Sequence, residues 1–347
     1  MYLRMGLPAG WYPQLSGKMR DNLKNRIFSI KDDVTFGKLA LDIFRYQSSS
    51  NIVYRNFTEL LGIDRESVVS FSDIPFLPVE FFKDHKVITG EKEPVIVFES
   101  SRTTGSVPAK HYIIDPGLYL GSLLSSFGMF YGDPASFIIA ALLPSYSERG
   151  NSSLVYMVNR LIEKSGHELS GFYNNDAEAL ITNINKAKRT GEKVILIGVS
   201  FALLDIAERY SPDFSGVTIM ETGGMKGSRK EITRQELHSF LNAGFHTDTI
   251  HSEYGMTELL SQAYSGGDGI FYSPPWMKIL IRDPQDPLSL IPGTGTTGGI
   301  NVIDLANLDS CSFLATGDLG KVHPDGSFEV AGRFDASDIR GCNLMVE

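Results

Sequence analysis

The chain has 347 residues, of which 42% are hydrophobic, so it has enough apolar material for a large core divided into two or three subdomains. Its 32 Lys and Arg residues against 41 Asp and Glu residues give a net charge of -9, which argues against general nucleic-acid binding. No apolar run approaches the ~20 residues of a membrane span, and residues 1–14 lack the apolar core of a secretory signal. We therefore expect a cytoplasmic protein without a membrane span.

Residues 1–94 are predicted to form a mainly helical N-terminal lead-in. Within it, residues 33–44 show the spacing of a helix that follows an Asp cap, with Val34, Leu39 and Phe44 assigned to the core. No cofactor role is expected for this segment.

A strand at residues 95–98 is followed by a loop rich in hydroxyl groups, residues 100–110, which ends in Lys110. Such a loop delivers backbone N–H groups, hydroxyl donors and an ammonium group to one place, as binding a triphosphate requires. It is not the usual P-loop, because Lys110 lies five residues past Gly105 instead of directly after a glycine. A solvated turn is the alternative for this segment alone.

From residue 95 to 270 the sequence alternates apolar strands with amphipathic helices. Residues 136–143 and 194–199 are the most apolar of these strands. The alternation predicts an α/β subdomain with a mixed or parallel sheet covered by helices, and a ligand at the carboxyl ends of its strands. The segments that leave two of these strands, residues 142–147 and 198–204, are candidate linings of an apolar ligand pocket, and each can equally be ordinary core.

A second polar segment, Tyr254 to Glu258, follows a short predicted strand. The ring of Tyr254 is suited to stacking on a purine, and Gly255 permits close approach of the backbone. Glu258 is suited to holding Mg²⁺ against phosphate oxygens, since this hard cation prefers oxygen ligands. The alternative is a strand end closed by a glycine turn, with Thr257 or Glu258 capping a helix.

Residues 271–347 change to short strands and Gly/Pro turns, which predicts a β-rich subdomain resembling a distorted barrel. Residues 322–330 are predicted to form a hairpin that turns at Asp325-Gly326 and brings Asp318 near Arg333. A carboxylate and a guanidinium at this place suit the sugar of a nucleotide, although such a pair is more commonly a surface ion pair.

These segments together resemble the adenylate-forming superfamily, which contains acyl-CoA synthetases, luciferases and peptide-synthetase adenylation domains. The resemblance depends on the order of four motifs: S-S-x-T-T-G-x-x-P-x-K from residue 100, Y-G-M-T-E from 254, T-G-D from 316 and G-R-x-D from 332. Within the superfamily the chain is similar to the LuxE-like acyl-protein synthetase family, because of its length and its segments 73–83 and 339–344.

The resemblance implies specific roles for residues of each motif. The ATP phosphates would contact Ser100, Ser101, Thr103, Thr104, Gly105 and Lys110. Tyr254 would lie on the adenine, with Gly223 and Gly224 close to it, and Thr257 would touch the α-phosphate. Glu258 would help to place Mg²⁺, and Asp318 would bind the ribose hydroxyls, with Arg333 close by.

The chain departs from the superfamily pattern in two places. Arg102 stands where most relatives carry a glycine, which adds a charge and disfavours a positive φ angle. The sequence also ends twelve residues after Asp335, so we expect the small C-terminal lid domain of most relatives to be absent.

The function expected from this resemblance is activation of a carboxylic acid, most simply a fatty acid, with ATP. The acyl group would pass from acyl-AMP to a thiol. The resemblance implies a cysteine near the end of the chain, and Cys342 follows Arg340, a cation that favours its ionised form. An inert Cys342 is the alternative, and Cys311, within an apolar segment, is expected to be core. Other possibilities are a ligase that uses coenzyme A, and a non-catalytic partner of an acyl-CoA or acyl-protein reductase.

Overall fold

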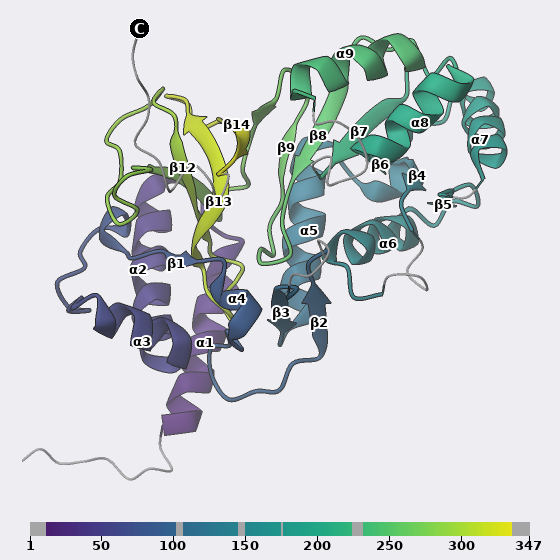
Figure 1. Cartoon of the computed structure of the whole chain (residues 1–347). Coiled ribbons are helices and arrows are strands. Elements are labelled where there is room, and N and C mark those ends of the chain that lie inside the picture. The colour runs from purple at the N-terminus through teal and green to yellow at the C-terminus, as the bar shows by residue number, and fades with distance from the viewer. Residues whose placement is uncertain (1–11, 102–106, 145–149, 175, 224–231, 335–347) are drawn as a thin grey trace, which may run out of the picture.

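The computed structural model describes residues 12–101, 107–144, 150–174, 176–223 and 232–334 (Figure 1). Its first part is mainly helical. The elements there are α1 (Tyr12–Ile27), α2 (Asp33–Ser50), α3 (Ile52–Leu60), the 3-10 helix η1 (Phe71–Asp73), β1 (Leu77–Pro78) and α4 (Phe81–Asp84). No helix within the described ranges is both long enough and apolar enough to cross a membrane.

Helix α2 begins where the sequence predicted. Asp32 caps it, because its side chain accepts a hydrogen bond from the backbone N–H of Thr35. Leu39 and Phe44 are buried, but the assignment of Val34 to the core was wrong, since Val34 is 65% exposed. Val34 lies in the first helical turn, on the side away from the face that Leu39 and Phe44 share.

The α/β sheet has the strand order β5-β4-β6-β7-β8-β9. Its neighbours are parallel except for the antiparallel pair β8 and β9. The strands are β4 (Ile138–Leu142), β5 (Gly171–Phe172), β6 (Val194–Val199), β7 (Thr218–Thr222), β8 (Ile250–Tyr254) and β9 (Ala263–Ser265). The apolar runs in β4 and β6 are buried on both faces, as central parallel strands require.

Helices cover both faces of this sheet, and each face forms its own core (Figure 1). One face carries α5 (Pro116–Phe130) and α6 (Ser153–Ser165). The other carries α7 (Ala177–Thr190), α8 (Ser200–Tyr210) and α9 (Arg234–Phe245). The short 3-10 helix η2 (Pro134–Ser136) precedes β4.

The β-rich part is a second sheet of order β10-β14-β13-β12-β11. Its strands are β10 (Ile270–Phe271), β11 (Met277–Arg282), β12 (Gly298–Asp304), β13 (Phe313–Val322) and β14 (Phe328–Arg333). Strands β13 and β14 form the predicted hairpin, in which Gly326 adopts a φ of +85°. Glycine accepts this conformation without strain.

The N-terminal lead-in packs on this second sheet. Strand β1 pairs with β13 in parallel, with Leu77 opposite Leu314. The rings of Phe44 and Tyr54 contact Phe313 from the helical side. The first and the last part of the sequence therefore share one region in space, although the alternating α/β segment separates them in the chain (Figure 1).

Candidate functional site

The predicted phosphate loop connects two antiparallel strands, β2 (Ile96–Glu99) and β3 (Lys110–Ile113). Two hydrogen bonds close the base of the loop: Ser100 N–H donates to the Ala109 carbonyl at 3.0 Å, and Ala109 N–H donates to Ser100 Oγ at 2.9 Å. Lys110 begins β3, and its Nζ lies 3.7 Å from Glu99 Oε1. Ser101 is exposed, whereas Arg102, Thr103, Thr104 and Gly105 lie outside the described residues.

Tyr254 ends β8 and connects the α/β sheet to the β-rich sheet. Its hydroxyl donates a hydrogen bond to Asp318 Oδ2 at 2.9 Å, and its ring packs against Phe271 and Phe328. Burial raises the pKa of Tyr254 well above its ordinary value, so the phenol keeps its proton and remains a donor.

Asp318 and Arg333 lie opposite each other in the β13–β14 hairpin, as the sequence predicted. Arg333 Nε donates to Asp318 Oδ1 at 3.1 Å. Asp318 is buried, but the Arg333 side chain is 60% exposed, so the ion pair itself contributes little to stability. The pair instead holds the Asp318 carboxylate in a fixed position beside Tyr254.

His111, which sequence reasoning missed, ties the lysine strand to the Tyr254–Glu258 segment. Its Nδ1 donates to the Thr257 carbonyl oxygen at 2.8 Å, since that oxygen can only accept. Its Nε2 lies 3.0 Å from Asn307 Oδ1, and Asn307 Nδ2 donates to the Glu258 carbonyl at 2.7 Å. Burial lowers the pKa of His111 to about 4. The two side chains fix the backbone on which Thr257 and Glu258 stand.

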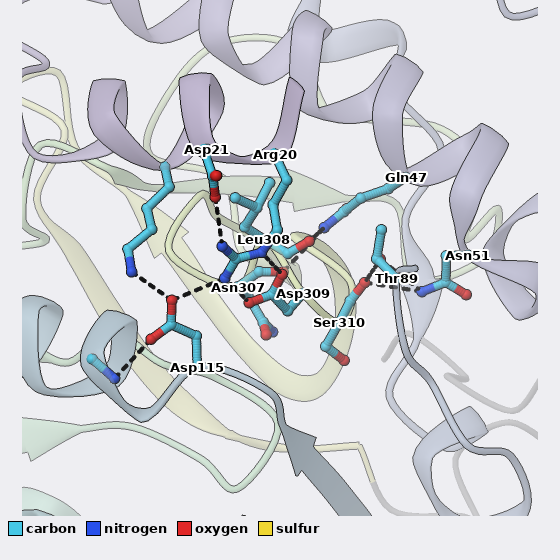
Figure 2. A network of polar contacts seen from close by, with 12 residues as sticks. Arg20, Asp21, Gln47, Asn51, Thr89, Asp115, Asn307, Leu308, Asp309 and Ser310 are labelled. Carbon is cyan, nitrogen blue, oxygen red and sulfur yellow. Dashed lines mark hydrogen bonds and ion pairs between the residues drawn. The ribbon is translucent and has the colours of Figure 1, made fainter. Parts of the chain in front are cut away.

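Asn307 belongs to the hub loop, residues 307–312, which joins β12 to β13 and is held by a dense polar network (Figure 2). Arg20 from α1 donates to both carboxylate oxygens of Asp309, at 2.6 Å each, and to Asp115, the cap of α5. Gln47 and Asn51 donate to backbone carbonyls of the same loop. The hub loop thereby connects the N-terminal helices, α5 and the candidate site.

Two glycines of the candidate site are set apart, Gly223 by its backbone conformation and Gly255 by the side chain packed against it. Gly223 follows β7 with a φ of +76°, and its carbonyl accepts a hydrogen bond from Ser200 Oγ at 2.9 Å. A Cβ atom on Gly255 would lie only 2.3 Å from Glu253 Oε1. Gly224 lies outside the described residues.

The carboxylate expected to hold Mg²⁺ belongs to Glu258, which is buried and follows Thr257 directly. Within the described part of the chain, no cluster of three or more His, Cys, Asp and Glu side chains could hold a metal ion. A single carboxylate fits Mg²⁺ that arrives with a nucleotide, because Mg²⁺ takes most of its ligands from waters and phosphates.

Of the two cysteines, the structure describes Cys311 alone. Cys311 is completely buried, and burial raises the pKa of its thiol to about 12, so it is core, as expected. Cys342 lies outside the described residues.

Comparison with known proteins gives relatives for both sequence and fold. The chain is 26% identical to the long-chain-fatty-acid–luciferin-component ligase of Vibrio harveyi, over 89% of this chain and 86% of that protein. A solved 2-hydroxyisobutyryl-CoA ligase, in complex with 2-HIB-AMP and CoA, matches 95% of this chain and 70% of its own with a TM-score of 0.63 at 13% identity. The chain is thus similar to this ligase over most of the length of both proteins.

A second solved structure shares the fold of this chain. The luciferase-like enzyme of the mealworm Zophobas morio matches with a TM-score of 0.51 at 17% identity, over 72% of this chain. The match spans 59% of the mealworm enzyme's own length. No protein-family model matches the sequence. The predicted α/β fold of the adenylate-forming ligases is confirmed for the part that the neighbours share.

Proposed function

We propose that the protein activates a carboxylic acid with ATP and transfers the acyl group to a thiol. The main support is that hydrogen bonds link three motifs that are distant in the chain. Tyr254 contacts Asp318, and the Thr257 carbonyl contacts His111, the neighbour of Lys110. These contacts bring the strand that begins at Lys110 and the hairpin that carries Asp318 to the Tyr254–Glu258 segment. This supports the binding of one mononucleotide by the residues to which we assign phosphate, metal and sugar contacts.

In the first step an oxygen of the acid attacks the α-phosphorus of ATP. The bond between that phosphorus and the oxygen bridging to the β-phosphate breaks, so pyrophosphate leaves and acyl-AMP remains. Lys110, the hydroxyl groups of residues 100–104 and backbone N–H groups of the loop would stabilise the charge that develops. One preorganised donor of this kind contributes about 3 kcal/mol. Bound beside Glu258, Mg²⁺ would neutralise further phosphate charge.

In the second step a thiolate attacks the acyl carbon, and AMP leaves with the electron pair of the broken bond. Cys342 is the thiol that we propose, because the buried, protonated thiol of Cys311 is unsuited to attack. The thioester would then be delivered to a reductase partner. Coenzyme A is the alternative acceptor.

Exchange of radiolabelled pyrophosphate into ATP tests the first step directly. We expect exchange that depends on an added acid from a panel of short, long and aromatic acids. Lys110→Ala and Asp318→Ala should each reduce it by about 100-fold, the loss typical of removing one preorganised group. Lys86→Ala is the matched control, since Lys86 is an exposed lysine paired with Glu93. Silence across the whole panel would contradict the proposal.

Labelling tests the second step. Incubation with a radiolabelled acid and ATP should leave label on the denatured protein, and hydroxylamine should remove it. We expect Cys342→Ser to lose this label while its pyrophosphate exchange continues. Thioester label that persists in Cys342→Ser would reject this acceptor, and turnover that requires coenzyme A would identify the protein as a CoA ligase.

A further inference from the structure

A cluster of polar side chains distinct from the hub loop lies beside the Tyr254–Glu258 segment. It is on the opposite face of β8 from Asp318. Successive side chains of a strand point to opposite faces, so Glu253 points away from the side on which Tyr254 meets Asp318. Thr222 Oγ1 donates to Glu253 Oε2 at 2.5 Å. The other carboxylate oxygen lies directly beside Gly255. A carboxyl group therefore stands against the segment that carries Thr257.

Three further buried polar groups belong to the elements around Glu253, namely β9, the segment before it, and α5. Tyr264 stands opposite Glu253 in the β8–β9 register, and Gln262 lies beside Gly255. Ser126 belongs to the face of α5 on which Ser122 contacts Ser261 and Phe130 packs against Tyr264. We call Ser126, Thr222, Glu253, Gln262 and Tyr264 the Glu253 cluster.

The polar atoms of the Glu253 cluster are incompletely paired. Ser126 Oγ, Gln262 Oε1 and the Tyr264 hydroxyl are buried, and none has a hydrogen-bond partner within the described part of the chain. Leaving one such group unpaired costs about 1–3 kcal/mol, so native proteins retain them where another molecule completes the bonds. The Glu253 cluster consequently has the character of a binding site for a polar group.

The position of the Glu253 cluster indicates that the acid substrate carries this polar group. The acid must reach the α-phosphate near Thr257, and the Asp318 side of the segment is assigned to the sugar. The opposite side, where Glu253 lies, is left for the acid. The cluster combines carboxyl and amide oxygens, which accept hydrogen bonds, with hydroxyls that donate and accept. A hydroxyl group on the substrate can donate to the acceptor oxygens and accept from the hydroxyls. A second carboxylate on the substrate would instead be repelled by the negative charge of Glu253.

We propose that the inner end of the acid site is the Glu253 cluster, and that the preferred substrate is a carboxylic acid bearing a hydroxyl group away from its carboxylate. This inference rests on the proposed function and specifies its substrate class. A plain alkyl chain in the same place would leave the buried oxygens unpaired, which is how sites built around a substrate hydroxyl discriminate.

Matched pairs of acids test this proposal. In each pair a hydroxyl replaces a methyl group: 4-hydroxybenzoate with 4-methylbenzoate, 5-hydroxypentanoate with hexanoate, and one terminally hydroxylated long-chain acid with its methyl counterpart. The readout is the ratio of kcat/KM values for acid-dependent pyrophosphate exchange. We expect at least one pair to favour the hydroxy acid by about tenfold or more. Glu253→Leu should bring that ratio close to one by lowering the rate with the hydroxy acid.

A second variant keeps the test valid if Glu253→Leu does not fold. Tyr264→Phe removes only a hydroxyl and should reduce the same ratio several-fold, while Tyr272→Phe, at an exposed position bridged to Tyr264, should leave it unchanged. Exchange with ratios near one for every pair, or ratios that neither cluster variant alters, overturns this inference and leaves the proposed function intact. Absence of exchange with every acid overturns both.

Discussion

The hub loop and the Glu253 cluster both bury polar side chains beside the Tyr254–Glu258 segment, yet their hydrogen bonds are satisfied to different degrees. In the hub loop, Asp309 has two hydrogen bonds from Arg20, and Gln47 both donates to and accepts from the loop. In the Glu253 cluster, three buried atoms lack partners among the described residues. A fully paired network fixes a backbone, whereas an incompletely paired one is suited to binding a ligand.

The largest effect that separates the two regions should come from Arg20→Met. The change leaves the buried carboxylate of Asp309 without its cationic partner, and breaking a buried pair in this way costs about 3–5 kcal/mol. We expect the free energy of unfolding, measured with urea, to fall by that amount. Arg209→Met is the matched control, because Arg209 is exposed and its pair with Asp205 should contribute less than about 1 kcal/mol. Equal losses of unfolding free energy in Arg20→Met and Arg209→Met would contradict a structural role of the hub loop.

The corresponding change in the other region, Glu253→Gln, should have the opposite sign. Burial raises the pKa of Glu253 from 4.5 to about 7 in the folded protein. The folded state therefore holds this proton more tightly than the unfolded chain, and the resulting stability is lost as pH rises from about 4.5 through 7. Glutamine does not ionise, so the variant should be more stable than the parent by up to about 3 kcal/mol at pH 8 and equal to it near pH 4.

Urea unfolding at both pH values measures this difference. The control is Glu329→Gln, whose carboxylate is partly exposed. Burial acts to raise the pKa of Glu329, but Lys321 and His323 outweigh it and lower that pKa. Its replacement should therefore cause a small loss at pH 8. A Glu253→Gln variant that is less stable than the parent at pH 8 would show that the carboxylate is fully compensated.

An intermediate effect should come from His111, which couples the hub loop to the site. His111→Phe leaves the Thr257 carbonyl without its donor, so the segment bearing Thr257 and Glu258 should shift. We expect kcat/KM for ATP to fall about tenfold while KM for the acid changes little. His111→Asn retains a donor in place of Nδ1 and should recover part of the loss. If His111→Phe only reduced the amount of folded protein, and the folded fraction kept the kinetic constants of the parent, His111 would have a structural role alone.

The parts of the fold that the sequence predicted depend on local signals. The Asp325-Gly326 turn placed Asp318 near Arg333, and the apolar runs of β4 and β6 indicated the buried sheet. The pairing of β1 with β13 was beyond such reasoning, because it joins segments far apart in the chain. Two residues of β1 carry no periodic pattern that could reveal their partner.

The side chains that sequence reasoning missed stand next to residues that it selected as candidates. His111 follows Lys110, and Glu253 precedes Tyr254, but neither belongs to the motif beside it. A single histidine or glutamate is more often structural, so its role becomes visible only when distant partners such as Asn307 and Tyr264 are placed. An ionisable residue within an otherwise buried strand was the available signal for Glu253.

The smallest effect should come from Tyr254→Phe, which tests the side of the segment assigned to the sugar. The change removes one hydroxyl that donates to Asp318 and keeps the ring between Phe271 and Phe328. Losing one hydrogen bond costs about 1 kcal/mol, so KM for ATP should rise about fivefold. The ratio of hydroxy to plain acids should stay constant, because the Glu253 cluster lies on the opposite face of β8. A change in that ratio without a change in KM for ATP would exchange the two assignments, placing the acid beside Asp318 and the sugar beside Glu253.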